Sequence, residues 1–121
     1  MNNRVLILED NDERIKQFKK NFLNVDITFT KIAEECIEIL ENNKKFDYIF
    51  LDHDLGGKEM LKSGDGTGYE VAKWLEANPS KIPKGKIYCH SLNPAGALNI
   101  SLATGAERLP FIWLNKLDFN G

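Results

Sequence analysis

Short apolar runs alternate with longer amphipathic stretches along the whole chain. The runs at 5–8 and 47–51 lack polar alternation, which is typical of β-strands that are covered on both faces. Residues 25–30 alternate apolar and polar side chains, which predicts a more exposed strand. Two further short runs, 86–89 and 111–114, predict a fourth and a fifth strand. The pattern therefore predicts five strands separated by longer segments.

Each longer segment carries apolar residues at helical spacing, as Ile15, Phe18 and Phe22 show in the first of them. Four helices are therefore predicted, the last and most weakly patterned over 95–103. The residues expected to cap the helix starts are Asn11 or Asp12, Thr30, Thr67 in a capping box with Glu70, and Asn93 followed by Pro94.

The predicted order is strand–helix repeated from the first strand to the fifth. This order calls for a parallel sheet with right-handed crossovers and helices on both faces, hence an α/β fold. Five strands suit the flavodoxin-like order 2-1-3-4-5, whose ligand crevice lies at the carboxyl ends of the strands near strands one and three. A length of 121 residues fits one domain over 1–121.

Composition narrows the class of protein. A chain that is 42% hydrophobic and 28% charged can bury a core, which excludes an intrinsically disordered protein. The apolar runs are too short to cross a membrane, and the start lacks the apolar region of a signal peptide, so we expect a cytoplasmic protein. With 16 basic and 18 acidic residues, bulk DNA binding is not expected, although an RNA end held in a pocket is compatible. Cys36 and Cys89 are expected to be buried free thiols.

Residues able to do chemistry follow four of the predicted strands. They are Glu9 and Asp10 after the first strand, Asp52, His53 and Asp54 after the third, His90, Ser91 and Asn93 after the fourth, and Lys116 after the fifth. Because the third strand lies between the first and the fourth in the predicted order, these ends converge on one crevice. Carboxylates packed together repel one another, which predicts a cation between them.

We expect Glu9, Asp10 and Asp52 to hold a divalent metal ion. Carboxylates alone favour Mg²⁺, whereas mixed imidazole and carboxylate ligands favour Mn²⁺, Fe²⁺ or Zn²⁺. In an extended strand Asp52 and His53 point to opposite faces, so both reach one ion only if the strand bends there. If the strand does not bend, His53 contacts the metal ligands and not the metal ion itself.

The strings at 6–11 and 49–52 resemble the receiver domain of two-component response regulators. In that family an acidic pair holds Mg²⁺, the aspartate after strand three accepts a phosphoryl group, a Ser or Thr ends strand four, and a Lys ends strand five. The matching residues are Glu9, Asp10, Asp52, Ser91 and Lys116. Two departures are Leu117, where receivers usually have Pro, and a final helix that we expect to be missing.

Three further strings give a closer resemblance, to cyclic-phosphate processing receiver-like domains. They are LDHDLGG at 51–57, GTGYEVA at 66–72 and HSLNPAG at 90–96. The resemblance implies a phosphoesterase that processes cyclic phosphates, such as 2′,3′-cyclic RNA ends or cyclic nucleotides.

For that reaction we expect catalytic roles for Asp52, His53, Asp54 and His90, with Ser91, Asn93 and Lys116 binding phosphate. A metal-free mechanism with the two histidines as acid and base is an alternative, but the carboxylates would then face an anionic phosphate without a cation.

Two other classes of function stay open at this stage. One is a signalling receiver phosphorylated on Asp52, which would need neither histidine. The other is a catalytically silent receiver that acts through protein contacts. The expected partner is a small phosphate-containing substrate or an RNA end. Phe111, Trp113 and Phe119 predict either a homodimer interface or a tail that folds back over the sheet.

Overall fold

A computed structural model describes residues 3–56, 61–109 and 111. Its strands are β1 (Asn3–Leu8), β2 (Val25–Thr30), β3 (Tyr48–Leu51), β4 (Ile87–Cys89) and β5 (Glu107–Arg108). Its helices are α1 (Asp12–Asn21), α2 (Ala33–Asn42), α3 (Gly68–Ala77), the short 3₁₀ helix η1 (Pro79–Lys81) and α4 (Pro94–Thr104). All four strand pairs are parallel and the order is β2-β1-β3-β4-β5, so the predicted fold class is confirmed.

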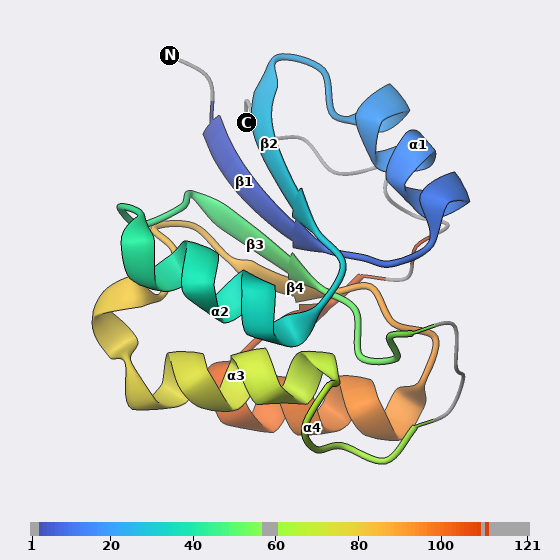
Figure 1. The fold of residues 1–121 in the computed structure, drawn as a ribbon, viewed down its shortest axis with the longest axis vertical. Coiled ribbons are helices and arrows are strands. Elements are labelled where there is room, and N and C mark those ends of the chain that lie inside the picture. The colour runs from blue at the N-terminus through green and yellow to red at the C-terminus, as the bar shows by residue number, and fades with distance from the viewer. Residues whose placement is uncertain (1–2, 57–60, 110, 112–121) are drawn as a thin grey trace.

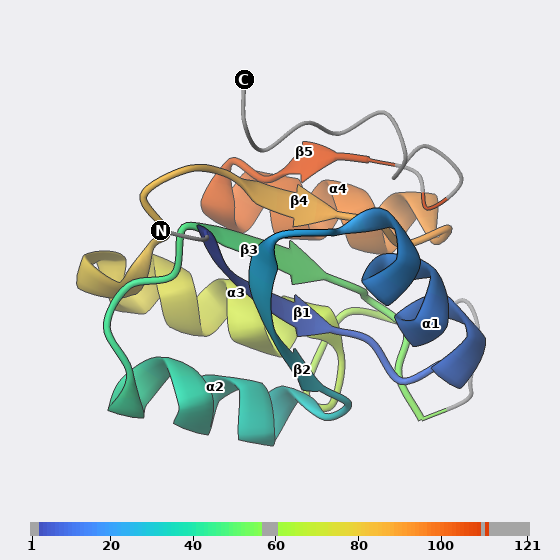
Figure 2. The same cartoon turned by 90° about the horizontal axis from the view of Figure 1, so that it is seen from above.

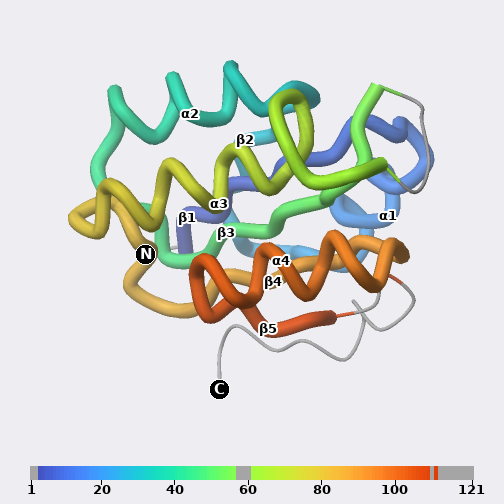
Figure 3. Tube along the Cα trace, turned by 90° about the horizontal axis from the view of Figure 1, so that it is seen from below, coloured from blue at the N-terminus to red at the C-terminus, as the bar shows by residue number. Residues whose placement is uncertain are grey.

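The helices divide unequally between the two faces of the sheet. Figures 1 and 2 show α1 on one face, with α2, α3 and α4 on the other. The core on the α1 face contains Val5, Ile7, Phe18, Phe22, Phe50 and Tyr88. The larger core on the opposite face includes Leu6, Leu8, Ile49, Leu51, Ile87 and Cys89, and there α3 and α4 lie side by side (Figure 3). Neighbouring residues of each strand therefore enter different cores, as the period of two in a strand requires.

The fifth strand is shorter and earlier in the chain than predicted. It covers 107–108, and the N–H of the next residue, Leu109, donates to the carbonyl of Cys89 at 2.9 Å. Phe111 lies in a 3₁₀ turn rather than a strand, and the rest of the predicted strand, 112–114, lies outside the described residues. Lys116 and Leu117 also lie outside them, so the expected absence of a final helix is not tested. The sequence interpretation was wrong because the polar Glu107 and Arg108 make an edge strand, which needs no continuous apolar run.

The caps of α1 and α4 are as predicted. The Asn11 side chain accepts from the N–H of Arg14, and the Asn93 side chain accepts from the N–H of Gly96. At its other end α4 stops at Gly105, which has a left-handed conformation with φ of 75°. Cys36 and Cys89 are buried free thiols, also as predicted.

The caps predicted for α2 and α3 were wrong in detail. Thr30 is the last residue of β2, and α2 begins later, with Ile32 at its cap and no side-chain cap bond. Thr67 does cap α3, but its hydroxyl donates to the carbonyl of Gly64 at 2.7 Å instead of forming a capping box. A local turn thus competes successfully for the side chain that the helix start would use.

Within the described residues, no helix is both long and apolar enough to span a lipid bilayer.

Candidate functional site

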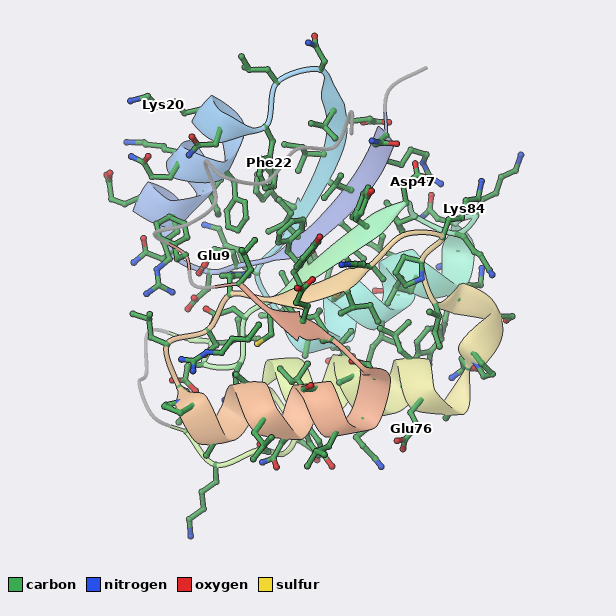
Figure 4. All side chains as sticks on the ribbon, turned by 180° about the vertical axis from the view of Figure 1, so that it is seen from behind. Glu9, Lys20, Phe22, Asp47, Glu76 and Lys84 are labelled. Atoms are coloured by element: carbon green, nitrogen blue, oxygen red, sulfur yellow. The ribbon has the colours of Figure 1, made fainter. Side chains whose placement is uncertain are left out.

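Three side chains at the carboxyl ends of adjacent strands form one row across the sheet. The register pairs Ile7 with Phe50 and Phe50 with Tyr88 on the α1 face. Two residues further along each strand stand Glu9, Asp52 and His90. The backbone bonds from Asp52 N to Leu8 O at 3.1 Å and from His90 N to Leu51 O at 3.2 Å continue the register. The side chains of the row therefore return to the α1 face, and Figure 4 shows Glu9 between α1 and the sheet.

We call Glu9, Asp52 and His90 the row cluster. One ligand atom from each of the three lies within 4.8 Å of the others. All three residues are buried, and His90 Nε2 lies 3.0 Å from Glu9 Oε1. Glu9 Oε2 accepts from the N–H groups of Asp10 at 3.0 Å and Asn11 at 3.1 Å, which fixes the carboxylate in place. Asp10, predicted as a metal ligand beside Glu9, is half-buried and is not part of this group.

Arg14 of α1 is a member of the site that the sequence interpretation missed. Its Nη1 lies 3.7 Å from Glu9 Oε1 and 3.7 Å from Asp52 Oδ2. Its guanidinium carbon lies 5.4 Å from the centre of the Phe111 ring, and the side chain is 27% exposed. A usable signal was present, because a cap at Asn11 places Arg14 in the first turn of the helix that follows Glu9.

Burial and mutual charge set the protonation of the row cluster. Burial raises the pKa of Asp52 to about 6, and the negative charge of Glu9 adds to the rise. Burial also acts to raise the pKa of Glu9, but the hydrogen bond and charge of His90 outweigh it, so that pKa is lowered. One carboxylate is thus held ionised beside another that takes up a proton more readily than an ordinary aspartate does.

The row cluster fits a divalent metal ion on its donor chemistry. Two carboxylates and an imidazole are a donor set that suits Mn²⁺, Fe²⁺ or Zn²⁺ as well as Mg²⁺. Since a carboxylate only accepts, Nε2 of His90 carries the proton towards Glu9. Among the described atoms, the buried Nδ1 of His90 then has no hydrogen-bond partner. A buried acceptor without a donor is satisfied by a cation or by a proton-bearing ligand.

His53 lies on the opposite face of the sheet and belongs to a different cluster. Its Nδ1 donates to Asp54 Oδ1 at 2.7 Å, and its Nε2 lies 2.8 Å from Ser63 Oγ. The ring packs against Gly96 of α4, where a Cβ atom would overlap it. His90 instead packs against Phe18 of α1, with the ring centres 5.1 Å apart. The two histidines therefore do not face a common space, which removes the basis of the metal-free pair mechanism.

The predicted phosphate-binding residues of strand four also turn away from the row cluster. Ser91 is buried, and its Oγ accepts from the N–H of Asn93 at 3.1 Å. The Asn93 side chain donates to Asp54 Oδ1 and to the carbonyl of Leu61, both at 3.0 Å. His90 thus occupies the place beside Asp52 that the receiver resemblance gave to Ser91.

Comparison with solved structures gives receiver folds. A signal receiver domain from Vibrio parahaemolyticus is 21% identical, with a TM-score of 0.67 over 91% of this chain and 78% of that one. The phosphorylated cyanobacterial phytochrome response regulator RcpA is 15% identical, with a TM-score of 0.72 over 96% and 91%. The Mn²⁺-bound response regulator Rcp1 is 15% identical, with a TM-score of 0.63 over 94% and 90%. These likenesses establish the fold.

Comparison of sequences adds the family. A curated relative, an NAD(P)H-quinone oxidoreductase subunit from the organellar chromatophore of Paulinella chromatophora, is 26% identical over 109 residues. These cover 88% of this chain, which spans 27% of the length of that relative. Residues 4–104 match the cyclic-phosphate processing Receiver domain, and this match covers most of the chain. With the receiver order of its strands and the row of Glu9, Asp52 and His90 at their ends, the chain belongs to the cyclic-phosphate processing Receiver domain family.

Proposed function

We propose that this domain is a divalent-metal-dependent phosphoesterase that acts on a cyclic phosphate at the row cluster. The observation that carries the proposal is the in-register row of Glu9, Asp52 and His90, three buried metal-ligand side chains within 4.8 Å of one another. Such a concentration of ligand groups at the crevice of an open parallel sheet is a typical place for a substrate site. The family to which the chain belongs supports the same substrate class.

Glu9 and Asp52 would hold the metal ion, with His90 beside them. When bound, a divalent cation supplies charge neutralisation, polarises a phosphoryl oxygen and lowers the pKa of a water molecule. The Mn²⁺-bound receiver neighbour supports a cation in a fold of this kind. Mn²⁺ and Mg²⁺ are therefore the first ions to test.

Arg14 supplies the positive charge that a phosphate needs. A guanidinium binds phosphate oxygens through two parallel hydrogen bonds, and Arg14 reaches the row cluster from the first turn of α1. Its side chain is part-exposed, so it can exchange its carboxylate partners for a substrate that enters from solvent. The row cluster thus carries carboxylates for a cation and an arginine for an anion.

His90 is the group placed to move a proton. Its Nε2 is held by Glu9 Oε1, which orients the ring, and the second nitrogen is left available among the described atoms. An imidazole oriented by a carboxylate is a common general acid or base. Hydrolysis of a cyclic phosphate releases a proton from the attacking water and needs one for the leaving ribose oxygen, and we assign both transfers to Nδ1 of His90.

A phosphoacceptor role for Asp52 is the second candidate function. The position of Asp52 directly after β3 favours it, as do the receiver neighbours, one of them phosphorylated. An imidazole beside Asp52 is not required for that reaction.

One paired experiment tests both functions. Purified protein with Mn²⁺, Mg²⁺ or EDTA is assayed against 2′,3′-cyclic nucleotides and an RNA with a cyclic phosphate end, and labelling by acetyl phosphate is measured in parallel. We expect metal-dependent ring opening that is lost in Asp52→Asn and kept in Asp26→Asn, an exposed carboxylate of β2. Stable labelling of Asp52 without hydrolysis of any cyclic phosphate would refute the phosphoesterase and establish the signalling receiver.

A further inference from the structure

A second group of reactive side chains, joined in a series of hydrogen bonds, lies on the face of the sheet opposite the row cluster. Asp54 Oδ1 accepts from His53 Nδ1 at 2.7 Å, and His53 Nε2 lies 2.8 Å from Ser63 Oγ. Because Nδ1 donates its proton to a carboxylate, Nε2 of the neutral ring is an acceptor, and the Ser63 hydroxyl donates to it. The order carboxylate, imidazole, hydroxyl is the arrangement that activates a serine nucleophile.

The surrounding contacts hold this hydrogen-bonded series in place. Asp54 Oδ1 also accepts from Asn93 Nδ2 at 3.0 Å and from the N–H of Leu61 at 3.2 Å. Ser63 Oγ accepts from Asn99 Nδ2 at 2.8 Å, so its own proton is directed to His53. The His53 side chain is fully buried, whereas Ser63 is part-exposed. The base is therefore fixed inside the protein, and the nucleophile belongs to a part-exposed residue.

A groove of about 600 Å³ opens beside Ser63. Its lining includes Leu61, Lys62, Ser63, Pro94, Ala95 and Asn99. Ala95 lies in the first turn of α4, where its backbone N–H has no partner inside the helix, and such a group stabilises a developing oxyanion. Lys62, an exposed side chain, is the only cation among the described lining residues, while Asp54 brings a negative charge to the nucleophile. This balance of charge suits an uncharged electrophile better than a phosphate.

We propose that Ser63 is the nucleophile of a second, metal-independent site that hydrolyses uncharged carboxylic esters, with His53 as its base and Asp54 as a positioning residue. Ser63 Oγ forms a bond to the carbonyl carbon, its proton passes to His53 Nε2, and the carbonyl π electrons move to the oxygen. When the carbonyl re-forms, the bond to the alkoxide breaks and the alkoxide takes the proton from Nε2. Water then attacks the acyl-Ser63 ester, its proton passes through Nε2 to Ser63 Oγ, and the acid leaves. The sum is ester plus water to acid plus alcohol.

A fluorophosphonate probe, an uncharged electrophile specific for activated serines, tests the nucleophile directly. The full chain is treated in EDTA, and the modified residue is located by mass spectrometry. We expect labelling at Ser63, none at the exposed Ser80, and loss of labelling in Ser63→Ala. Asp54→Asn is expected to slow labelling about 100-fold, because the ring loses its orienting carboxylate. Labelling of Ser63 at the rate of Ser80 would overturn the proposal.

A cysteine at the same position separates activation from a merely structural hydrogen bond. Ser63→Cys is alkylated by iodoacetamide over a range of pH, with Ser80→Cys as the matched control. The natural Cys36 and Cys89 give little background, because both are buried and burial raises their pKa values to about 12 and about 11. We expect Cys at 63 to react at least about 10-fold faster than Cys at 80 near pH 6.5, since an adjacent imidazole stabilises the thiolate.

Asp54→Asn in the Ser63→Cys background is expected to move that pH profile towards the profile of Ser80→Cys. Identical pH profiles for the cysteines at 63 and 80 would show that His53 does not act as a base. The fluorophosphonate reaction is run in EDTA, in which the proposed metal-dependent phosphoesterase should be inactive. Failure of the ester site and failure of the proposed phosphoesterase are therefore distinguishable.

Discussion

Glu9 and His90 meet through a hydrogen bond of 3.0 Å although 81 residues separate them in the chain. Their strands, β1 and β4, are not neighbours, because β3 lies between them. The contact therefore passes over the end of β3, where Asp52 occupies the central position of the row cluster. Both side chains are fully buried, and Glu9 is the hydrogen-bond partner of the His90 ring.

His90→Ala should therefore damage stability as well as turnover. Removing the imidazole leaves the buried Glu9 carboxylate without one of its hydrogen-bond donors, at a cost of about 1–3 kcal/mol in the free energy of unfolding, measured by urea denaturation. Because a loss of this size can unfold a small domain, His90→Gln is the better test of catalysis. Its amide can still donate to Glu9, and we expect turnover of a cyclic phosphate to fall 10²–10⁴-fold with the fold retained. Wild-type turnover in His90→Gln would disprove the role assigned to His90.

Divalent metal ions should stabilise the folded domain. A ligand at about 100 times its dissociation constant adds about 2.7 kcal/mol to the free energy of unfolding. Thermal melts with Mn²⁺ or Mg²⁺ are expected to shift upward for the natural protein and for Asp26→Asn, and to stay unchanged for Asp52→Asn. If no divalent ion shifts the melt of the natural protein, the row cluster is not a metal site.

Arg14→Gln should change metal affinity and substrate affinity in opposite directions. Arg14 competes with a divalent cation for Glu9 and Asp52, so its removal should tighten metal binding several-fold, equivalent to about 1 kcal/mol. The loss of a phosphate-binding guanidinium should raise KM for the cyclic phosphate. Calorimetry and steady-state kinetics give the two values, with Lys16→Gln on the exposed side of α1 as control. A parallel fall in both affinities would contradict the competition.

The metal-free protein should lose stability between about pH 4 and pH 6 through Asp52. Its pKa of about 6 in the folded protein exceeds the ordinary value of 3.8, because burial penalises the carboxylate. The folded state therefore binds the proton more tightly than the unfolded chain, and the free energy of unfolding falls as the pH rises through this window. Asp52→Asn lacks this loss, and in EDTA its stability relative to the natural protein should increase from pH 4 to pH 7, by about 3 kcal/mol at most. A difference that does not vary with pH would rule out the raised pKa.

Gly96→Ala should destabilise the domain by about 1–3 kcal/mol, because the new methyl group would overlap the His53 ring. The same overlap should displace His53 and lower the reactivity of Ser63 towards the fluorophosphonate probe. Gly64→Ala is the matched control, since a Cβ at Gly64 meets nothing within 4 Å and its backbone needs no positive φ. Urea denaturation should give equal or slightly greater stability for the control. A full probe reaction in Gly96→Ala would show that the packing of His53 does not govern Ser63.

Much of the fold followed from the sequence, because hydrophobic periodicity depends on local geometry. The uninterrupted runs at 5–8 and 47–51 indicated strands covered on both faces, and alternation of strands with helices left few parallel arrangements. Asn11 and Asn93 marked helix starts correctly because their capping bonds reach only three residues along the chain. The edge strand at 107–108 was not predicted, because both of its residues are exposed and polar and it therefore has no apolar run.

The division of the site between two faces was decided by tertiary structure. The sequence placed His53 and His90 at strand ends, and both lie there. The register of the strands, however, brings His90 into contact with Glu9 on one face and His53 into contact with Ser63 on the other. Register depends on long-range pairing of β1, β3 and β4, and a shift of one residue would exchange the faces. Arg14 reaches the row cluster because α1 packs on the same face of the sheet, and the cap at Asn11 gave only its place in the first turn. The sequence therefore determined which residues could do chemistry, and packing of the sheet determined which of them act together.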